Sequence, residues 1–155
     1  MIDWSRTYHT GLVVEDIEAA KTFYENSMGL RFTETKVFDP LPFWTPEQGS
    51  HEVVVHACYS QPGPNHLELC QGTGAFYSVT ELPDSRHVGV WVDDVAAEAE
   101  RLSALGWQPL AAGSSPEEGY GSICYLRAPV GQLVVELVST ELEAFINDWM
   151  ATAIG

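Results

Sequence analysis

The chain has 155 residues, of which 45% are apolar and 19% charged, so it carries enough apolar material for a folded core and lacks the composition of a disordered chain. Its 7 Lys and Arg against 22 Asp and Glu give a formal net charge of −15, which disfavours nucleic acid and anionic membranes as partners. We expect a cytoplasmic protein, because the sequence shows neither a signal peptide nor a transmembrane run. Its cysteines, Cys58, Cys70 and Cys124, lie in apolar stretches at irregular spacing, which indicates buried thiols in a reducing compartment.

Residues 8–17 read YHTGLVVEDI, a short apolar strand that leads into a helix signal. Apolar residues then recur near 3.6 spacing, which predicts a helix that begins after an N-cap at Asp16 and ends at Met28-Gly29. The rest of this half predicts strands at RFTETKV (31–37), HEVVVHACY (51–59) and NHLELCQ (65–71), a loop at 38–50 and a linker at about 72–85.

Residues 86–95 read RHVGVWVDDV, almost the same phrase as residues 8–17. A second helix is predicted from an N-cap at Asp94 to Leu105-Gly106. It is followed by predicted strands at WQPLA (107–111), GSICYLRA (121–128) and QLVVELVS (132–139), with a loop at 111–120. The last segment predicts a C-terminal helix whose apolar face carries Leu142, Phe145, Ile146 and Trp149.

The two phrases align in register when position 9 is set on position 87. The matched pairs are His9 with His87, Gly11 with Gly89, Val14 with Val92, Asp16 with Asp94 and Ala19 with Ala97. Both halves then run strand, helix, strand, strand, strand. A tandem duplication explains this agreement, and it predicts an α+β fold of two tandem βαβββ modules.

The last strand of each half carries a carboxylate between apolar residues, Glu68 in HLELCQ and Glu136 in VVELVS. A buried carboxylate needs a cation, a hydrogen-bond partner or a raised pKa. The first strands offer partners, because His9 and His87 begin them in equivalent places. A pseudo-two-fold axis would bring both His-Glu pairs to one point, and two imidazoles with two carboxylates suit a divalent first-row metal.

Four phrases resemble the vicinal oxygen chelate superfamily, the group of glyoxalase I, bleomycin-resistance proteins and extradiol dioxygenases. They are YHTGLVVEDIEAAKTFYENSMGLRF, HLELCQ, RHVGVWVDDVAAEAERLSALG and APVGQLVVELV. The resemblance implies a cup-shaped, partly open eight-stranded sheet around a metal site. We expect a single glyoxalase-like domain over 1–139, made of module 1 (7–71) and module 2 (86–139), and a C-terminal helix over 140–155.

In that family each module supplies one metal ligand from its first strand and one from its last. Carried over by motif, the ligands are His9, Glu68, His87 and Glu136. A coordinating Glu or Gln at the Glu68 position is typical of glyoxalase I and methylmalonyl-CoA epimerase. The resemblance therefore implies a divalent-metal-dependent lyase or isomerase/epimerase acting on a small molecule with vicinal oxygens, by proton transfer through a metal-bound enediolate. Glu136 or Glu68 is the implied base, with a slight preference for Glu136, and the ion is Ni, Co, Zn, Mn, Mg or Fe.

The basic residues are scattered and form no cluster that suits glutathione or coenzyme A, so a smaller or more apolar substrate is expected. The residues expected to contact it are His66, Trp91, Phe43, Trp44 and Tyr120, with Phe76 and Tyr77 as further wall residues.

Two other functions stay open from the sequence. One is an extradiol-type Fe(II) dioxygenase using His9, His87 and Glu136, and the other is a non-catalytic protein that binds a drug or metabolite. We also expect a homodimer, and the sequence does not decide whether the metal site lies within one chain or is shared by two.

Overall fold

The computed structural model describes residues 1–79 and 86–153. In the first module a 3₁₀ turn, Trp4–Arg6, precedes β1 (Thr7–Val13), α1 (Ile17–Met28), β2 (Arg31–Phe32), β3 (Lys36–Thr45), β4 (Gly49–Gln61) and β5 (His66–Gly72). The second module contains β6 (His87–Val92), α2 (Val95–Ala104), β7 (Gln108–Ala112), a 3₁₀ turn at Pro116–Glu118, β8 (Ile123–Arg127) and β9 (Val134–Ser139). A 3₁₀ turn, Thr140–Leu142, then leads into α3 (Glu143–Ala151).

Both predicted N-caps are present at the starts of the first two helices. The Asp16 carboxylate accepts a hydrogen bond from the Ala19 N–H, and the Asp94 carboxylate accepts one from the Ala97 N–H, each at 3.0 Å. These bonds satisfy amides that the first helical turn leaves without a partner. At the other end of α1, Gly29 takes the left-handed conformation with φ 68°, as the predicted helix end requires.

The predicted loop at 38–50 is wrong, because β3 continues as far as Thr45 and β4 begins at Gly49. The predicted strand at 31–37 is interrupted, and its pieces β2 and β3 both pair with β4. At the interruption Thr33 replaces regular pairing: its N–H donates to the Tyr59 carbonyl and its hydroxyl accepts from the Tyr59 N–H. Part of the predicted linker, residues 80–85, lies outside the described residues, as do residues 154–155 of the predicted C-terminal helix.

The described strands form one nine-stranded sheet in the order β2-β4-β3-β7-β8-β9-β6-β1-β5. A further pairing between β4 and β5 closes eight of these strands into a ring, with β2 added to the edge of β4. Within each module the first and last strands are parallel neighbours, β1 with β5 and β6 with β9. The two modules join in two places, through antiparallel β1–β6 pairing and through one residue pair between β3 and β7. The ring is therefore mostly closed, and its weakest joint is the β3–β7 contact.

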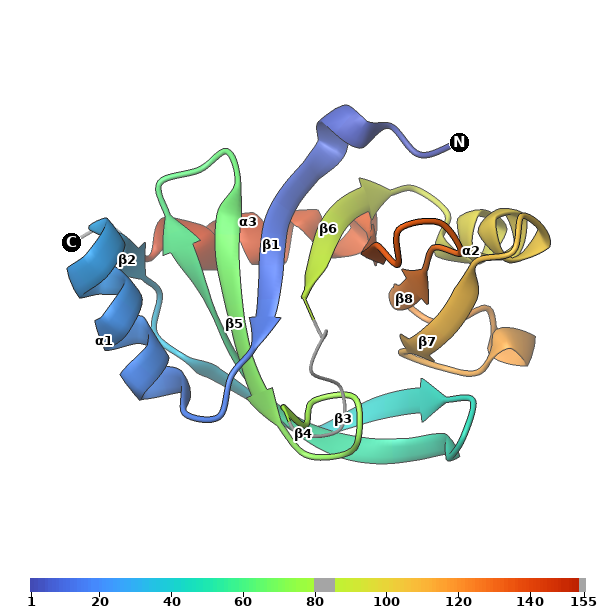
Figure 1. Cartoon of the computed structure of the whole chain (residues 1–155), viewed down its shortest axis with the longest axis horizontal. Coiled ribbons are helices and arrows are strands. Elements are labelled where there is room, and N and C mark those ends of the chain that lie inside the picture. Colours follow the sequence, from blue (N-terminus) through green and yellow to red (C-terminus); the bar gives the residue numbers. More distant parts are fainter. Residues whose placement is uncertain (80–85, 154–155) are drawn as a thin grey trace.

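The helices divide between the two faces of the ring. Figure 1 shows α1 and α2 at opposite ends of the molecule. Ile17 of α1 packs with Cys58 and Leu69, and the buried face of α2 packs with residues of β6, β8 and β9. The third cluster lies inside the ring and includes Trp149 of α3. Because α3 contributes to the inner core, it lies on the same side of the sheet as the predicted site. In residues 1–79 and 86–153 no helix combines the length and apolarity needed to span a bilayer.

The exposed N-cap of α2 provides a test of this local structure. Replacing Asp94 by Ala removes the acceptor for the Ala97 N–H and should lower the free energy of unfolding by about 1 kcal/mol. Asp94→Asn keeps a side-chain oxygen and should retain most of the stability. Urea unfolding of both variants measures the difference, and equal stabilities would contradict the capping role.

Candidate metal centre

The pairing of β1 with β6 sets each repeated histidine beside the glycine of the other repeat. His9 lies opposite Gly89, and Gly11 lies opposite His87. A Cβ atom on Gly89 would stand 2.0 Å from the His9 ring, and one on Gly11 would stand 2.0 Å from the His87 ring. The glycines are therefore required by close approach, since any side chain there would occupy the space of an imidazole.

Each glutamate lies in line, across the sheet, with one of these two glycine–histidine pairs. Glu68 on β5 lies beside Gly11, and Glu136 on β9 lies beside Gly89. Each carboxylate is thus separated from the other module's histidine by one glycine, which leaves the two side chains free to meet above the sheet. Because one chain provides all four side chains, a site shared between two chains is not needed to assemble the cluster.

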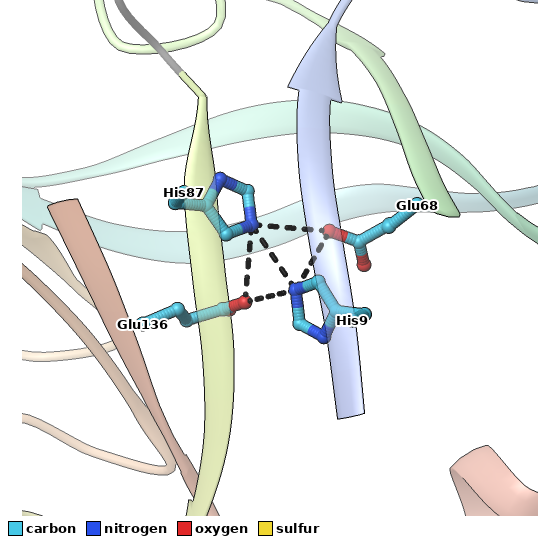
Figure 2. Close-up of side chains that lie close together, drawn as sticks. All are labelled: His9, Glu68, His87 and Glu136. Carbon is cyan, nitrogen blue, oxygen red and sulfur yellow. Dashed lines mark hydrogen bonds and ion pairs between the residues drawn. The ribbon is translucent and has the colours of Figure 1, made fainter. Parts of the chain in front are cut away.

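Figure 2 shows the four side chains pointing toward one another. The two Nε2 atoms of His9 and His87 are 3.1 Å apart. Glu136 Oε1 lies 3.1 Å from His9 Nε2 and 3.4 Å from His87 Nε2. Glu68 Oε1 lies 3.5 Å from His9 Nε2 and 3.4 Å from His87 Nε2. The predicted convergence is therefore observed, with one donor atom per residue and all four within 4.8 Å.

All four side chains are buried, which makes their charges interdependent. Burial opposes ionisation of Glu136, but its interactions with His87 and His9 outweigh that effect and lower its pKa to about 2. Burial also opposes ionisation of Glu68, but its interactions with His9 and His87 outweigh that effect and lower its pKa. Burial likewise opposes the charge on His87, yet the two carboxylates raise the pKa of its imidazole to about 10. Without a metal, the cluster holds its carboxylates as anions beside a protonated imidazole.

The arrangement fits a divalent cation. Donor atoms that share one ion at about 2.0–2.2 Å lie about 2.8–3.6 Å apart when the bond angle is about 90–110°. The five distances above fall in this interval. Moreover, buried Glu136 Oε1 has no hydrogen bond of good geometry among the described residues, so its lone pairs are available to a cation. His9, Glu68, His87 and Glu136 could hold such an ion, although their roles as ligands stay a prediction.

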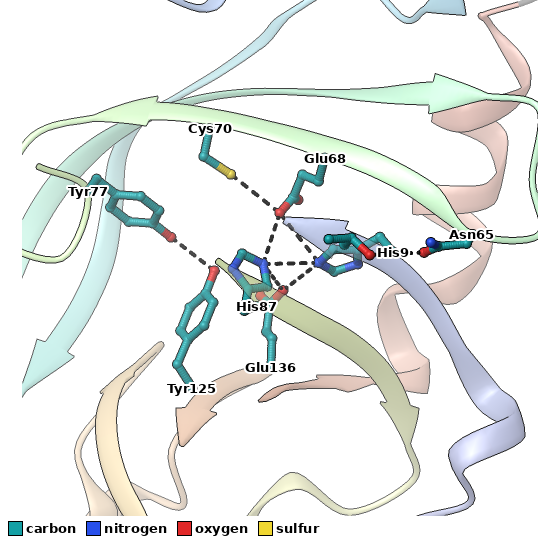
Figure 3. A network of polar contacts seen from close by, with 9 residues as sticks. His9, Asn65, Glu68, Cys70, Tyr77, His87, Tyr125 and Glu136 are labelled. Atoms are coloured by element: carbon teal, nitrogen blue, oxygen red, sulfur yellow. Dashed lines mark hydrogen bonds and ion pairs between the residues drawn. The ribbon is translucent and has the colours of Figure 1, made fainter. Parts of the chain in front are cut away.

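One contact makes the two halves unequal. The Cys70 thiol donates a hydrogen bond of 3.3 Å to Glu68 Oε1. Cys70 follows Glu68 by two residues on β5, whereas Val138 holds the corresponding place after Glu136 on β9. Figure 3 shows the thiol directed at the Glu68 carboxylate. Glu68 is therefore held in place by an outer hydrogen bond that Glu136 lacks.

A cavity of about 450 Å³ lies next to the cluster, with Glu68 and Glu136 in its wall. Its other walls are mainly apolar and come from β3, β4, β8, β9 and the C-terminal segment. The predicted apolar face of that segment lines the cavity through Leu142, Phe145, Ile146 and Trp149. The C-terminal helix thus completes the wall of the candidate site.

The structure places the predicted substrate-contacting residues outside the cavity wall. These residues are His66, Trp91, Phe43, Trp44 and Tyr120, and none of them lines the cavity. Nδ1 of His66 lies 2.8 Å from the Ser60 carbonyl, so the ring is directed to the β4–β5 turn. Phe43 is buried among other rings and Trp44 contacts Tyr120 in a different cluster.

Trp91 stacks on Tyr8, with ring centroids 4.1 Å apart, and Tyr8 separates it from His9. The wall residue among the predicted aromatics is Tyr77, while Phe76 packs behind it.

Three tyrosines of the cavity wall, Tyr8, Tyr59 and Tyr125, were not predicted from the sequence. Tyr59 pairs across the strands with Glu68, and Tyr125 pairs with Glu136, so each module sets a tyrosine beside its glutamate. The antiparallel register that places them there is not readable from one strand alone. Tyr8 reaches the interior next to His9 because the β1–β6 register shifts between Thr7 and His9, and such a bulge breaks the alternation of faces.

The close approach of the His9 ring to Gly89 predicts that a side chain at position 89 weakens metal binding. In Gly89→Ala the new methyl group occupies the position of the fully buried His9 ring, so His9 Nε2 should leave the cluster. Zinc or cobalt affinity should fall by about 100-fold or more. Gly113→Ala is the control, because its Cβ would meet nothing closer than 3.5 Å. Calorimetric titration with circular dichroism as a check on folding decides the matter, and unchanged affinity would refute the arrangement.

The raised pKa of His87, about 10, predicts that metal binding is linked to proton release. At about pH 7.5 the metal-free imidazole is protonated and must lose that proton before Nε2 can coordinate a cation. Raising the pH removes the competing proton, so affinity should rise about tenfold per pH unit across the neutral range. Calorimetry in buffers of different ionisation enthalpy should show release of about one proton. Its absence would contradict coordination by His87.

Comparison with known proteins agrees with this fold. The family model described as Glyoxalase/Bleomycin resistance protein/Dioxygenase superfamily matches residues 8–125. An uncharacterized protein of Bacillus subtilis (strain 168), YwbC, is 35% identical over 109 residues, which cover 64% of this chain and 72% of YwbC.

Two solved structures show the same fold at low identity. Methylmalonyl-CoA epimerase from Mycobacterium tuberculosis superposes with a TM-score of 0.55 at 18% identity, covering 93% of this chain and 97% of that chain. Hypothetical protein BH1468 from Bacillus halodurans C-125 gives 0.54 at 17% identity, covering 86% and 93%. With the family model matching most of its length, this chain belongs to the glyoxalase/bleomycin resistance protein/dioxygenase superfamily.

Proposed function

We propose that this protein is a divalent-metal-dependent lyase or isomerase/epimerase of the glyoxalase type. It would move a proton on a small molecule that carries two adjacent oxygens. The observation that carries the proposal is the convergence of two buried imidazoles with two buried carboxylates, and the carboxylates stand in the wall of a mainly apolar cavity. The likeness of fold to methylmalonyl-CoA epimerase supports this class of reaction without indicating the substrate.

The four side chains of the cluster are proposed to have different roles in the reaction. A divalent ion held by His9, His87 and the carboxylates would polarise two substrate oxygens and stabilise negative charge that develops on them. Glu136 is proposed as the base that takes a proton from the carbon next to the carbonyl and returns it. Glu68 is proposed as the carboxylate that stays in place, because the Cys70 thiol donates a hydrogen bond to it, whereas Val138 at the corresponding position offers none to Glu136.

Glu136 also faces the space where a substrate would lie, since it lines the cavity. The mainly apolar walls favour burial of a bound substrate there, and a low local polarity would strengthen the electrostatic interactions between its oxygens and the metal centre.

The cluster also contains the set of two histidines and one carboxylate that suits Fe(II) dioxygenases, namely His9, His87 and Glu136. The observation against that alternative is Glu68, whose carboxylate lies as close to both imidazoles as a fourth ligand would. Oxygen consumption with catechols in the iron-loaded protein distinguishes the two reactions.

The test is deuterium uptake by the metal-reconstituted protein. Protein stripped of metal and reloaded with Ni, Co, Zn, Mn or Mg is incubated in D₂O with 2-oxo compounds, α-hydroxy ketones and 1,2-dicarbonyl compounds. NMR should show metal-dependent exchange at the carbon beside the carbonyl. Glu136→Gln should slow exchange by about 100-fold or more, because it removes the base.

Glu68→Gln is the matched control, since it alters the other carboxylate and should weaken metal binding more than it slows exchange at saturating metal. No exchange with any of the metals, or full activity of Glu136→Gln, would refute the proposal.

A further inference from the structure

The part of the cavity beyond the metal centre has apolar walls from two directions. Phe38 and Leu41 enter from β3, while Phe145, Ile146 and Trp149 enter from α3. A ligand whose oxygens reach the centre therefore has its remaining atoms against hydrocarbon and aromatic rings. Such walls favour burial of an apolar group.

The charges around the cavity restrict that group further. Among its described lining residues the charged side chains are Glu68 and Glu136, and neither Lys nor Arg is present. A divalent ion would offset the two carboxylates, and no positive charge would remain for an anionic substituent. The exposed Lys36 lies 5.6 Å from the ring centres of Phe145 and Trp149, in a neighbouring groove that it shares with Glu34 and Asp148. An anionic group inside the cavity would lose its hydration without gaining a partner.

Two tyrosine hydroxyls provide a polar contact in this otherwise apolar space. The hydroxyls of Tyr77 and Tyr125 are 3.3 Å apart, and both residues line the cavity (Figure 3). Tyr125 also stands beside the centre, because it pairs with Glu136 across β8–β9 and its ring meets His87 edge-on at 5.0 Å. When one hydroxyl donates to the other, the acceptor hydroxyl still has a hydrogen to donate.

We infer that the cavity takes an uncharged aromatic or alicyclic substrate whose adjacent oxygens lie at one end. The Tyr77–Tyr125 pair donates a hydrogen bond to a further hydroxyl or carbonyl oxygen on the ring. This inference rests on the proposed function, because the metal centre fixes the end of the molecule that carries the adjacent oxygens.

Hydroxamates test the inference by binding alone, since they chelate divalent ions through two adjacent oxygens. Calorimetry on the zinc-loaded protein compares acetohydroxamate, benzohydroxamate, its 4-carboxylate, and its 3- and 4-hydroxy derivatives. Benzohydroxamate should bind about 30-fold more tightly than acetohydroxamate, because its phenyl ring is buried. The 4-carboxylate should bind about 100-fold more weakly than benzohydroxamate.

The tyrosine pair is tested by a difference between two probes. One of the two ring-hydroxylated probes should bind about 5-fold more tightly than benzohydroxamate. Tyr77→Phe should abolish that preference, so that the ring-hydroxylated probe binds no more tightly than benzohydroxamate does to the same variant. Tyr24→Phe is the matched control, because Tyr24 lies on α1, partly buried against the cluster of Ile17, Cys58 and Leu69, and outside the cavity wall.

The outcomes separate the two proposals. Loss of all metal-dependent hydroxamate binding would overturn the proposed function and this inference with it. Metal-dependent binding in which the methyl, phenyl and carboxyphenyl probes are equal would overturn the inference alone. A ring-hydroxyl preference that survives in Tyr77→Phe and Tyr125→Phe would overturn the role of the tyrosine pair.

Discussion

The antiparallel register between β1 and β6 is the constraint on which the candidate site depends. It sets His9 against Gly89 and His87 against Gly11, so each module makes the space that the other module's imidazole fills. A shift of one residue would place the two rings on opposite faces of the sheet, so they could not meet. The parallel pairings β1–β5 and β6–β9 then add the glutamates to the same two rows. The site is thus a property of the joint between the modules, and neither module contains it alone.

Burial of four ionisable side chains in one place is unfavourable unless their charges are matched. In the metal-free cluster the match comes from a protonated imidazole beside carboxylates, which explains why the pKa of His87 is raised to about 10 while that of Glu136 is lowered to about 2. A divalent cation can replace the proton in this role. Because such a cation binds the folded chain, its binding would also stabilise the fold.

The duplicated modules form a nearly symmetric centre, and two features, Cys70 and the helix α3, make its two halves different. The thiol of Cys70 reaches Glu68, whereas Val138 offers Glu136 no hydrogen bond. The C-terminal helix α3 adds Phe145, Ile146 and Trp149 to one wall of the cavity and has no counterpart after the first module. The two carboxylates therefore have different surroundings, and the cavity beside them is apolar on one side.

The sequence by itself determined the duplication, both N-capped helices, most strand positions and the four residues that converge. Each of these follows from local signals: the period of apolar residues, the Asp before each helix, and the repeated His-x-Gly phrase. Residues 38–45 of β3 were predicted as a loop because of their prolines, although pairing with β4 makes them part of a strand.

Only the tertiary structure decided which other side chains reach the cavity. Tyr59 and Tyr125 lie there through cross-strand register, and Tyr8 through a bulge. His66, in contrast, turns to the Ser60 carbonyl. The physical reason is that the alternation of side chains along a strand predicts which face of the sheet a residue lies on. It does not predict which other residues that face contacts. Those residues are set by how the modules pair and by where α3 packs, which are contacts between residues far apart in the chain.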